Sequence, residues 1–301
     1  MRLAVTGATG FVGGSLLGAA RGAGHEVRAL ARRTMEPRAG IEWVGGSLED
    51  GASLDRLCAG ADAVIHVAGV INARDHAGFE AGNVTGTAAI LAAAKAACVP
   101  RFIHVSSLAA REPNLSRYGA SKARAEVLVK TADIPFAIVR PPAVYGPGDR
   151  ETLELFKMAW RGLIALPPAG RLSLIHADDL APLLIALASS DAATGLTVEP
   201  DDGHPGGYSH REFAALLGRA VKRSSFAVPV PQAILRTAAA LDGLIRRDGA
   251  KLTPDRVDYF CHPDWVADPA KAVPSELWQP IIDTATGLAA TADWYRVEGW
   301  L

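Results

Sequence analysis

Short runs that are apolar throughout alternate, in the first half of the chain, with longer segments that carry apolar residues at helical spacing. A run without polar alternation is typical of a parallel strand covered on both faces. We expect strands at 2–6, 25–31, 41–44, 63–67, 101–106 and 136–139. We expect helices between them at 15–23, 54–58, 81–97 and 121–131. This order predicts an α/β fold built on a doubly wound parallel sheet.

The regular alternation ends after Arg140, where prolines and glycines interrupt the pattern. Helices at 151–160 and 177–188 and strands at 172–175 and 197–199 are still expected. From Pro200 onward, helical pieces separated by proline and glycine predict a smaller, mainly helical C-terminal lobe. Ligands of such folds bind outside the carboxyl edge of the sheet, so we expect this lobe to bind the substrate. The expected boundaries are 1–141 and 172–199 for the sheet domain, and 142–171 and 200–301 for the substrate lobe.

Three glycines at three-residue intervals separate the first strand from the first helix. Gly7 permits a tight turn, Gly10 leaves room for a pyrophosphate beside the backbone, and Gly13 lets the helix pack close to the sheet. The N-terminus of the helix offers free N–H groups and a partial positive charge to phosphates. This turn predicts dinucleotide binding, with candidate cofactor-binding residues Gly7, Thr9, Gly10, Phe11, Val12 and Gly13.

The residues after the second strand bear on the choice of nicotinamide cofactor. An acidic residue there would bind the ribose of NAD, whereas an arginine would pair with the extra phosphate of NADP. This chain has Arg32 and Arg33 at that point and no acidic residue before Glu36. We therefore favour NADP with Arg32 as a ligand, and NAD stays open because exposed surface arginines would give the same pattern.

A tyrosine and a lysine at helical spacing form the candidate proton-transfer site. Tyr118 and Lys122 are four residues apart, which places both on one face of a helix. The lysine cation is expected to lower the pKa of the phenol from its usual value of about 10. Ser107 follows the fifth strand and reaches the same sheet edge, where its hydroxyl can bind a substrate oxygen. Such a site suits hydride chemistry in which the cofactor moves the hydride and Tyr118 moves the proton.

Together these motifs resemble the extended short-chain dehydrogenases/reductases, a group that includes NAD-dependent epimerases, dehydratases and hydroxysteroid-type reductases. The matching segments are TGATGFVGG at 6–14, HVAG at 66–69, NVTGT at 83–87, VSS at 105–107, YGASK at 118–122, RPPAVYGP at 140–147, IHADDL at 175–180, and DPAKA at 268–272 followed by LWQP at 277–280. The resemblance covers nearly the whole chain. It implies a Rossmann domain and an oxidoreductase that commonly forms a homodimer.

The same resemblance assigns roles to individual residues. It makes Ser107, Tyr118 and Lys122 catalytic. The further cofactor-binding positions that it implies, beyond the Gly-rich turn, are Ser47, Leu48, Ala68, Gly69, Tyr118, Lys122 and the segment from Pro141 to Val144. One departure concerns Ser47, which stands where the family often has an aspartate that touches adenine; a serine hydroxyl can still form a hydrogen bond there, but the resemblance does not carry the adenine contact over to it.

The substrate is suggested by a missing arginine. Nucleotide-sugar members of the group carry a diphosphate-binding arginine four residues before the position of His176, where this chain has Leu172. Arg171 is one residue out of register, which on a strand points it to the opposite face. We therefore expect a reductase or dehydrogenase acting on an apolar ketone or secondary alcohol, lipid-like ones included, and this resembles hydroxysteroid dehydrogenases and dihydroflavonol-type reductases. A nucleotide-sugar epimerase or dehydratase with tightly bound NAD, and a non-catalytic dinucleotide-binding regulator, stay open as alternatives.

The segment from Gln232 to Arg247 has an amphipathic helical pattern with arginines off or beyond its apolar stripe. Such a helix can lie on a membrane surface, but we favour packing of the stripe against the core of its own lobe. The stripe consists of Ile234, Leu235, Ala238, Leu241, Leu244 and Ile245.

Charge, cysteine and histidine content bear on the possible partners, the cellular location and metal binding. Lys plus Arg number 31 and Asp plus Glu 32, which gives no support for a nucleic-acid partner. Three scattered cysteines suggest reduced thiols, and the first strand begins too early for a signal peptide, so we expect a cytoplasmic protein. The dispersed histidines match no zinc spacing, so no metal site is expected.

Overall fold

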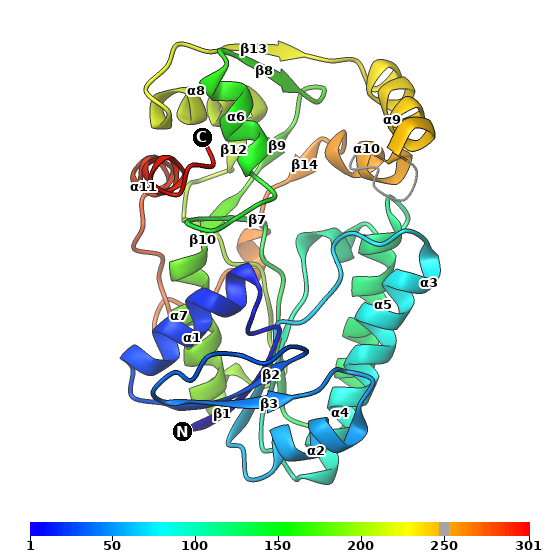
Figure 1. Ribbon diagram of the computed structural model, residues 1–301, viewed down its shortest axis with the longest axis vertical. Coiled ribbons are helices and arrows are strands. Elements are labelled where there is room, and N and C mark those ends of the chain that lie inside the picture. The colour runs from blue at the N-terminus through cyan, green and yellow to red at the C-terminus, as the bar shows by residue number, and fades with distance from the viewer. Residues whose placement is uncertain (247–252) are drawn as a thin grey trace. The chain divides into compact units, whose positions relative to one another are not determined.

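A computed structural model describes residues 1–246 and 253–301 of the chain (Figure 1). Its internal contacts divide these residues into two compact units, each built from three stretches of sequence. The first unit holds 1–141, 177–200 and 270–279, and the second holds 142–176, 201–269 and 280–301. Relative to the boundaries expected from sequence, 172–176 lie with the second unit and 270–279 return to the first.

The first unit is a seven-stranded parallel sheet in the order β11-β6-β5-β4-β1-β2-β3, which confirms the predicted doubly wound, Rossmann-type sheet. Its strands are β1 (Arg2–Thr6), β2 (Glu26–Ala31), β3 (Ile41–Gly45), β4 (Ala63–His66), β5 (Phe102–Val105), β6 (Phe136–Val139) and β11 (Thr197–Val198). The strands β4 and β5 are buried at every position, as expected for runs that are apolar on both faces. The carboxyl ends of all seven strands meet at one edge.

Helices cover both faces of this sheet. On one face α1 (Phe11–Gly22) packs against α7 (Ala177–Ser189), and on the other α2 (Gly51–Cys58), α4 (Gly86–Ala96) and α5 (Arg117–Thr131) lie side by side (Figure 1). Shorter pieces connect these elements: α3 (His76–Phe79), a π-helical turn (Glu80–Thr85), and 3-10 turns at Leu108–Arg111 and Asp191–Ala193. The core beneath α2, α4 and α5 is aliphatic, with Leu54, Leu57, Ile90, Val129 and Ile138 among its members.

The second unit combines short strands with helices. Its strands are β7 (Ala143–Tyr145), β8 (Leu163–Leu166), β9 (Arg171–Leu172), β10 (Leu174–His176), β12 (Tyr208–Ser209), β13 (Phe226–Pro229) and β14 (Asp264–Trp265). Its helices are α6 (Leu153–Trp160), α8 (His210–Ala220), α9 (Gln232–Arg246), α10 (Pro254–Phe260) and α11 (Thr284–Val297). A 3-10 turn at Pro269–Lys271 marks the return of the chain to the first unit. The core of the second unit is rich in rings, and Phe156 meets Tyr295 edge to face at 5.1 Å.

Two sequence expectations about the second unit are wrong. The strand expected at 172–175 is two strands: β9 pairs with β12 and β14, whereas β10 pairs with β7. Ser173 separates them, because its hydroxyl donates to the Asp201 carboxylate at 2.7 Å and its backbone N–H bonds Trp265. The break arises from partners distant in sequence, which a local pattern does not contain.

The described residues leave most of the apolar stripe of α9 exposed, contrary to the expectation that it packs within its own lobe. Leu244 and Ile245 are 76% and 79% exposed, and Ile234 and Leu241 are also exposed. Arg247, the last residue of the expected helix, lies outside the described residues. No helix among the described residues is both long enough and apolar enough to cross a membrane.

Candidate active site

The Gly-rich turn between β1 and α1 depends on backbone contacts that exclude side chains. Gly7 has a φ of +73°, and a Cβ on it would lie 2.5 Å from the backbone nitrogen of Ala68. A Cβ on Gly13 would lie 2.1 Å from the carbonyl oxygen of Gly7, so the helix can approach the turn only with glycine there. Gly10 is the N-cap of α1 and supplies no side-chain cap, which leaves the first N–H groups of the helix available to an anion. The turn therefore fits a dinucleotide pyrophosphate.

The residues expected near the adenosine end also lie at the carboxyl edge of the sheet. Arg32 and Arg33 follow β2 directly, are exposed, and form no ion pair with a described residue. Ser47 and Leu48 follow β3 and are partly buried. The Ser47 hydroxyl accepts a hydrogen bond from the backbone of Glu49 at 3.2 Å, which leaves its own proton for another partner.

The loop after β4 is fixed against α5 by an asparagine. Asn83, in the π-helical turn, accepts from the backbone of Val70 at 2.6 Å and donates to the Ser121 hydroxyl at 2.9 Å. A Cβ on Gly69 would lie 3.1 Å from the Asn83 amide oxygen and 3.6 Å from the Lys122 ammonium. The expected cofactor residue Gly69 thus lies directly beside the expected catalytic lysine, and Ala68 lies against the Gly-rich turn at Gly7.

The fold brings Ser107 and Tyr118 together although eleven positions separate them in sequence. Ser107 caps the 3-10 turn Leu108–Arg111, and Ser116 caps α5. A Cβ on Gly119 would lie 2.5 Å from the Ala109 carbonyl oxygen, so this glycine allows α5 to approach the 3-10 turn closely. The close approach brings the Ser107 side chain near enough to Tyr118 to act on the pKa of its phenol.

Burial shapes the ionisation of this pair and of the neighbouring lysine. Lys122 is 4% exposed, and its ammonium donates to the Val105 carbonyl oxygen at 2.7 Å. Desolvation lowers the pKa of Lys122 to about 8, although the Glu126 carboxylate opposes this change. Desolvation raises the pKa of Tyr118 more than the Ser107 hydrogen bond lowers it. The direction is opposite to the one expected from the lysine alone, and it keeps Tyr118 protonated near neutral pH.

Two buried histidines near Lys122 differ in their hydrogen-bond contacts. His66 bonds the hydroxyls of Thr6 at 2.7 Å and Thr87 at 3.0 Å. His104 stacks on His66 at 5.5 Å between ring centroids, yet neither of its nitrogens has a hydrogen-bond partner among the described residues. His66 is therefore a core histidine with both ring nitrogens bonded, whereas His104 is buried without a hydrogen-bond partner among the described residues. Burial and the Lys122 charge lower the pKa of both rings, which keeps the histidines neutral.

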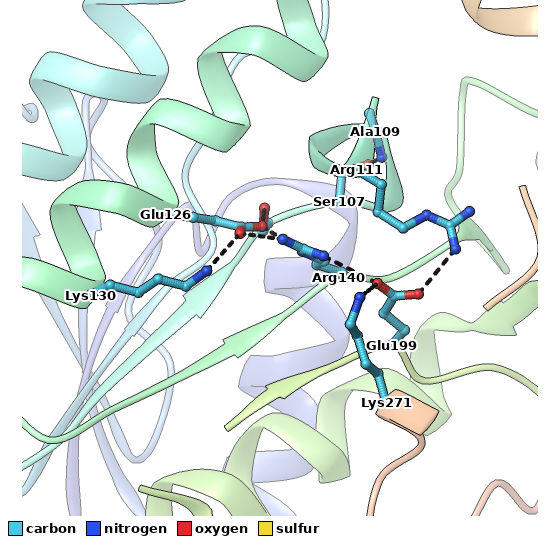
Figure 2. Close-up of polar contacts among 9 residues, drawn as sticks. Ser107, Ala109, Arg111, Glu126, Lys130, Arg140, Glu199 and Lys271 are labelled. Atoms are coloured by element: carbon cyan, nitrogen blue, oxygen red, sulfur yellow. Dashed lines mark hydrogen bonds and ion pairs between the residues drawn. The ribbon is translucent and has the colours of Figure 1, made fainter. Parts of the chain in front are cut away.

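A network of charged residues that were not predicted as site residues lies near Ser107 (Figure 2). Glu126 accepts a hydrogen bond from Ser106 at 2.6 Å and two from Arg140, at 2.8 and 2.7 Å. Glu199 extends the network through Arg140, Arg111 and Lys271. Glu126 could have been predicted near the site, because it follows Lys122 by four residues on the same helix. The link to Glu199 had no sequence signal.

The remaining expected site positions fall in both units. Pro141 is buried in the first unit, and its carbonyl oxygen accepts from the backbone of Leu108 at 3.1 Å, which ties it to the turn after Ser107. Val144 lies in β7 of the second unit. Within the first unit the arrangement can bind a dinucleotide and offer a proton from Tyr118, with Ser107 as a second hydroxyl for a substrate oxygen.

Comparisons with known proteins identify the family and the fold. The sequence profile of the NAD dependent epimerase/dehydratase family matches residues 3–195. A ceramide reductase of Caulobacter vibrioides is 40% identical, over 99% of this chain and 96% of that protein. A putative dihydroflavonol 4-reductase of Synechocystis is 28% identical, over 99% of this chain and 95% of that protein. The solved structure of MoeE5 in complex with UDP-glucose and NAD shares the fold, with a TM-score of 0.75, 21% identity and 99% coverage of both chains.

Proposed function

The chain belongs to the NAD dependent epimerase/dehydratase family, and from this premise we propose that it reduces an apolar, lipid-like ketone with a nicotinamide cofactor. The observation that carries the proposal is that the close approach of α5 to the 3-10 turn after Ser107 brings Ser107, Tyr118 and the buried Lys122 together. Because burial raises the pKa of Tyr118, the phenol is a proton donor at neutral pH, which suits reduction of a carbonyl group.

The reaction needs one hydride and one proton. A nicotinamide bound through the Gly-rich turn would supply the hydride to the carbonyl carbon. Tyr118 gives its proton to the carbonyl oxygen as the alcohol forms, and Ser107 orients that oxygen by a hydrogen bond. Lys122, with a pKa of about 8, is mostly cationic at neutral pH and stabilises the phenolate that remains.

We propose NADP as the preferred cofactor, with Arg32 as the ligand of its extra phosphate. The exposed guanidinium, which has no ion-pair partner in the described part of the chain, supports this choice because it is available to a phosphate. The cytoplasmic location and the homodimer implied by the sequence stay predictions.

The apolar substrate class rests on two observations. Arg171, the nearest candidate for binding a diphosphate, donates from Nε to the Gly206 carbonyl oxygen at 2.7 Å and from Nη2 to that of Gly207 at 2.6 Å. Both contacts lie in the second unit and hold the guanidinium against backbone carbonyl groups, which disfavours a nucleotide-sugar substrate. The relative of 40% identity is named a ceramide reductase, and a ceramide is a lipid.

The first experiment is titration of the purified protein with NADPH and NADH, followed by tryptophan quenching or calorimetry. A ketone panel then runs from short alkyl ketones to long-chain ketones and the keto form of a ceramide. We expect tight NADPH binding and stoichiometric NADPH consumption that favours the long-chain ketones. Preference for NADH, or NAD that cannot be removed, would instead support the alternative function, a nucleotide-sugar epimerase or dehydratase.

The exposed apolar stripe of α9 allows a test of whether the protein contacts a lipid surface that contains such a substrate. Because Leu244 and Ile245 are open to solvent, contact with a lipid surface becomes a specific alternative to packing within the unit. Flotation of the full chain with anionic vesicles tests it, and Val297→Glu, at another exposed apolar residue, is a control for Leu244→Glu. Absence of vesicle binding by the native protein would exclude this contact without affecting the proposed reaction.

A further inference from the structure

One buried carboxylate joins three elements that end at the candidate site. Glu126 is 2% exposed, and its Oε1 accepts from the Ser106 hydroxyl at 2.6 Å and from Arg140 Nε at 2.8 Å. Its Oε2 accepts from Arg140 Nη2 at 2.7 Å and lies 3.6 Å from the Lys130 ammonium. The two bonds from Arg140 form a bidentate pair, which fixes orientation as well as distance.

Glu126 and its partners Ser106 and Arg140 lie next to the residues of the proposed reaction. Glu126 lies one helical turn beyond Lys122 and two turns beyond Tyr118, on the same face of α5. Ser106 precedes Ser107 at the end of β5, and Arg140 precedes Pro141 at the end of β6. One carboxylate therefore sets the position of α5 against the ends of both strands.

A second buried carboxylate extends this frame to the turn after Ser107. Glu199 has no exposed side-chain surface and accepts from Arg140 Nη1 and from Arg111 Nη1, both at 3.2 Å (Figure 2). Arg111 closes the 3-10 turn that Ser107 caps. Lys271, in a stretch that returns late in the sequence to the first unit, lies 3.4 Å from Glu199. Every element that carries Ser107, Tyr118 or Lys122 is thus held by this network.

We propose that Glu126, held by Ser106 and Arg140, is a positioning residue of the reaction: it fixes Tyr118 and Lys122 against Ser107 and places a buried negative charge one helical turn from Lys122. The expected effect of Glu126 on turnover rests on the proposed function, whereas its expected effect on the Lys122 titration does not. Buried ion pairs often add little net stability compared with apolar residues of similar size, so stability alone does not explain this network.

The effect of the Glu126 charge on Lys122 follows from the other groups that surround Lys122. The neutral rings of His66 in β4 and His104 in β5 lie on the sheet side, and Tyr118 is protonated on the same helix. Of the groups that shift the Lys122 pKa, Glu126 is the one that raises it, against desolvation. Removal of its charge must therefore lower that pKa further below its present value of about 8.

The test is Glu126→Gln, which keeps the shape and removes the charge, measured by NADPH-dependent ketone reduction and by NMR titration of lysine labelled with ¹³C at Cε. The Lys122 signal is identified by its loss in Lys122→Met. We expect kcat to fall about tenfold to hundredfold with KM changed less than about threefold, since misplacement of reacting groups costs turnover more than binding. We also expect the Lys122 titration to move down by at least about half a pH unit.

A second variant separates geometry from charge and guards against misfolding of the first. Ser106→Ala removes one hydrogen bond to Glu126 and no charge, so kcat should fall while the Lys122 titration stays in place. Glu26→Gln, at an exposed ion pair on the opposite edge of the sheet, is the matched control and should leave both readouts unchanged. Thermal unfolding and cofactor titration establish that each variant is folded.

The outcomes separate the two proposals. A folded Glu126→Gln protein with kcat within about twofold of the native value and an unmoved Lys122 titration would overturn the positioning role. If the native protein reduces no ketone, the proposed function fails, and the NMR titration still decides whether Glu126 holds the Lys122 charge.

Discussion

Replacing Arg32 with aspartate should invert the cofactor preference. Arg32 directly follows β2, is exposed, and has no ion-pair partner among the described residues, so a phosphate would be its first charged contact. Two unit charges 4 Å apart interact by about 1 kcal/mol in water and by about 4 kcal/mol at an effective dielectric constant of 20. Because Arg32 is exposed, we take about 1–2 kcal/mol, which corresponds to about fivefold to thirtyfold in Kd.

The substitution removes this attraction and adds a repulsion of similar size. Arg32→Asp should therefore weaken NADPH binding by about thirtyfold to several hundredfold, while NADH binding stays within about threefold or improves, because the new carboxylate can accept a hydrogen bond from the free ribose. Calorimetric titration of each cofactor gives the two dissociation constants. High salt should weaken NADPH binding to the native protein and leave the variant nearly unaffected.

Arg38→Asp is the control, since Arg38 is an exposed arginine in the same loop and the change in net charge is identical. Equal losses of NADPH affinity in both variants would show a general charge effect and refute Arg32 as the phosphate ligand. An unchanged preference in Arg32→Asp would refute it as well.

Three further predictions concern the proposed site. Tyr118→Phe removes the proton donor and should lower ketone reduction by about a hundredfold or more without weakening cofactor binding; a variant retaining a tenth of native turnover would contradict this role. Gly13→Ala places a Cβ 2.1 Å from the Gly7 carbonyl oxygen and should weaken cofactor binding at least about tenfold, whereas Gly18→Ala, with open space around its Cβ, should bind normally and unfold at slightly higher temperature. Lys122 has a pKa of about 8 in the folded chain and an ordinary value of 10.5, so between these pH values the unfolded chain binds more protons and folding stability rises with pH. Urea unfolding should show native stability rising relative to Lys122→Met by about 2–3 kcal/mol from pH 8 to pH 10.5, and parallel stabilities of the two proteins would contradict this.

The sheet and its cofactor turn could be predicted because their signals are local. An apolar run such as Ala63 to His66 is buried along its whole length, and the spacing of Gly7, Gly10 and Gly13 reports backbone contacts within one turn. The pairing of Ser107 with Tyr118 was accessible for the same reason, since both follow one strand closely in sequence.

Other features depend on partners far along the chain. Glu126 meets Arg140 fourteen positions later, and Arg140 meets Glu199 fifty-nine positions later. The strand break at Ser173 requires Asp201, and the pattern of α9 specifies an apolar side without saying what covers it. The pKa of Tyr118 was expected in the wrong direction because sequence shows the neighbouring lysine but not the depth of burial.

The interleaving of the two units sets a practical rule for exchanging parts between relatives. The chain passes from one unit to the other at five places, near residues 141, 176, 200, 269 and 279. A fragment ending at residue 141 would lack β11 and α7, leaving the face of α1 that packs on α7 without its cover. A chimera that combines this first unit with a relative's second unit must therefore exchange three separate segments at once. A chimera with a single crossover point would divide both hydrophobic cores.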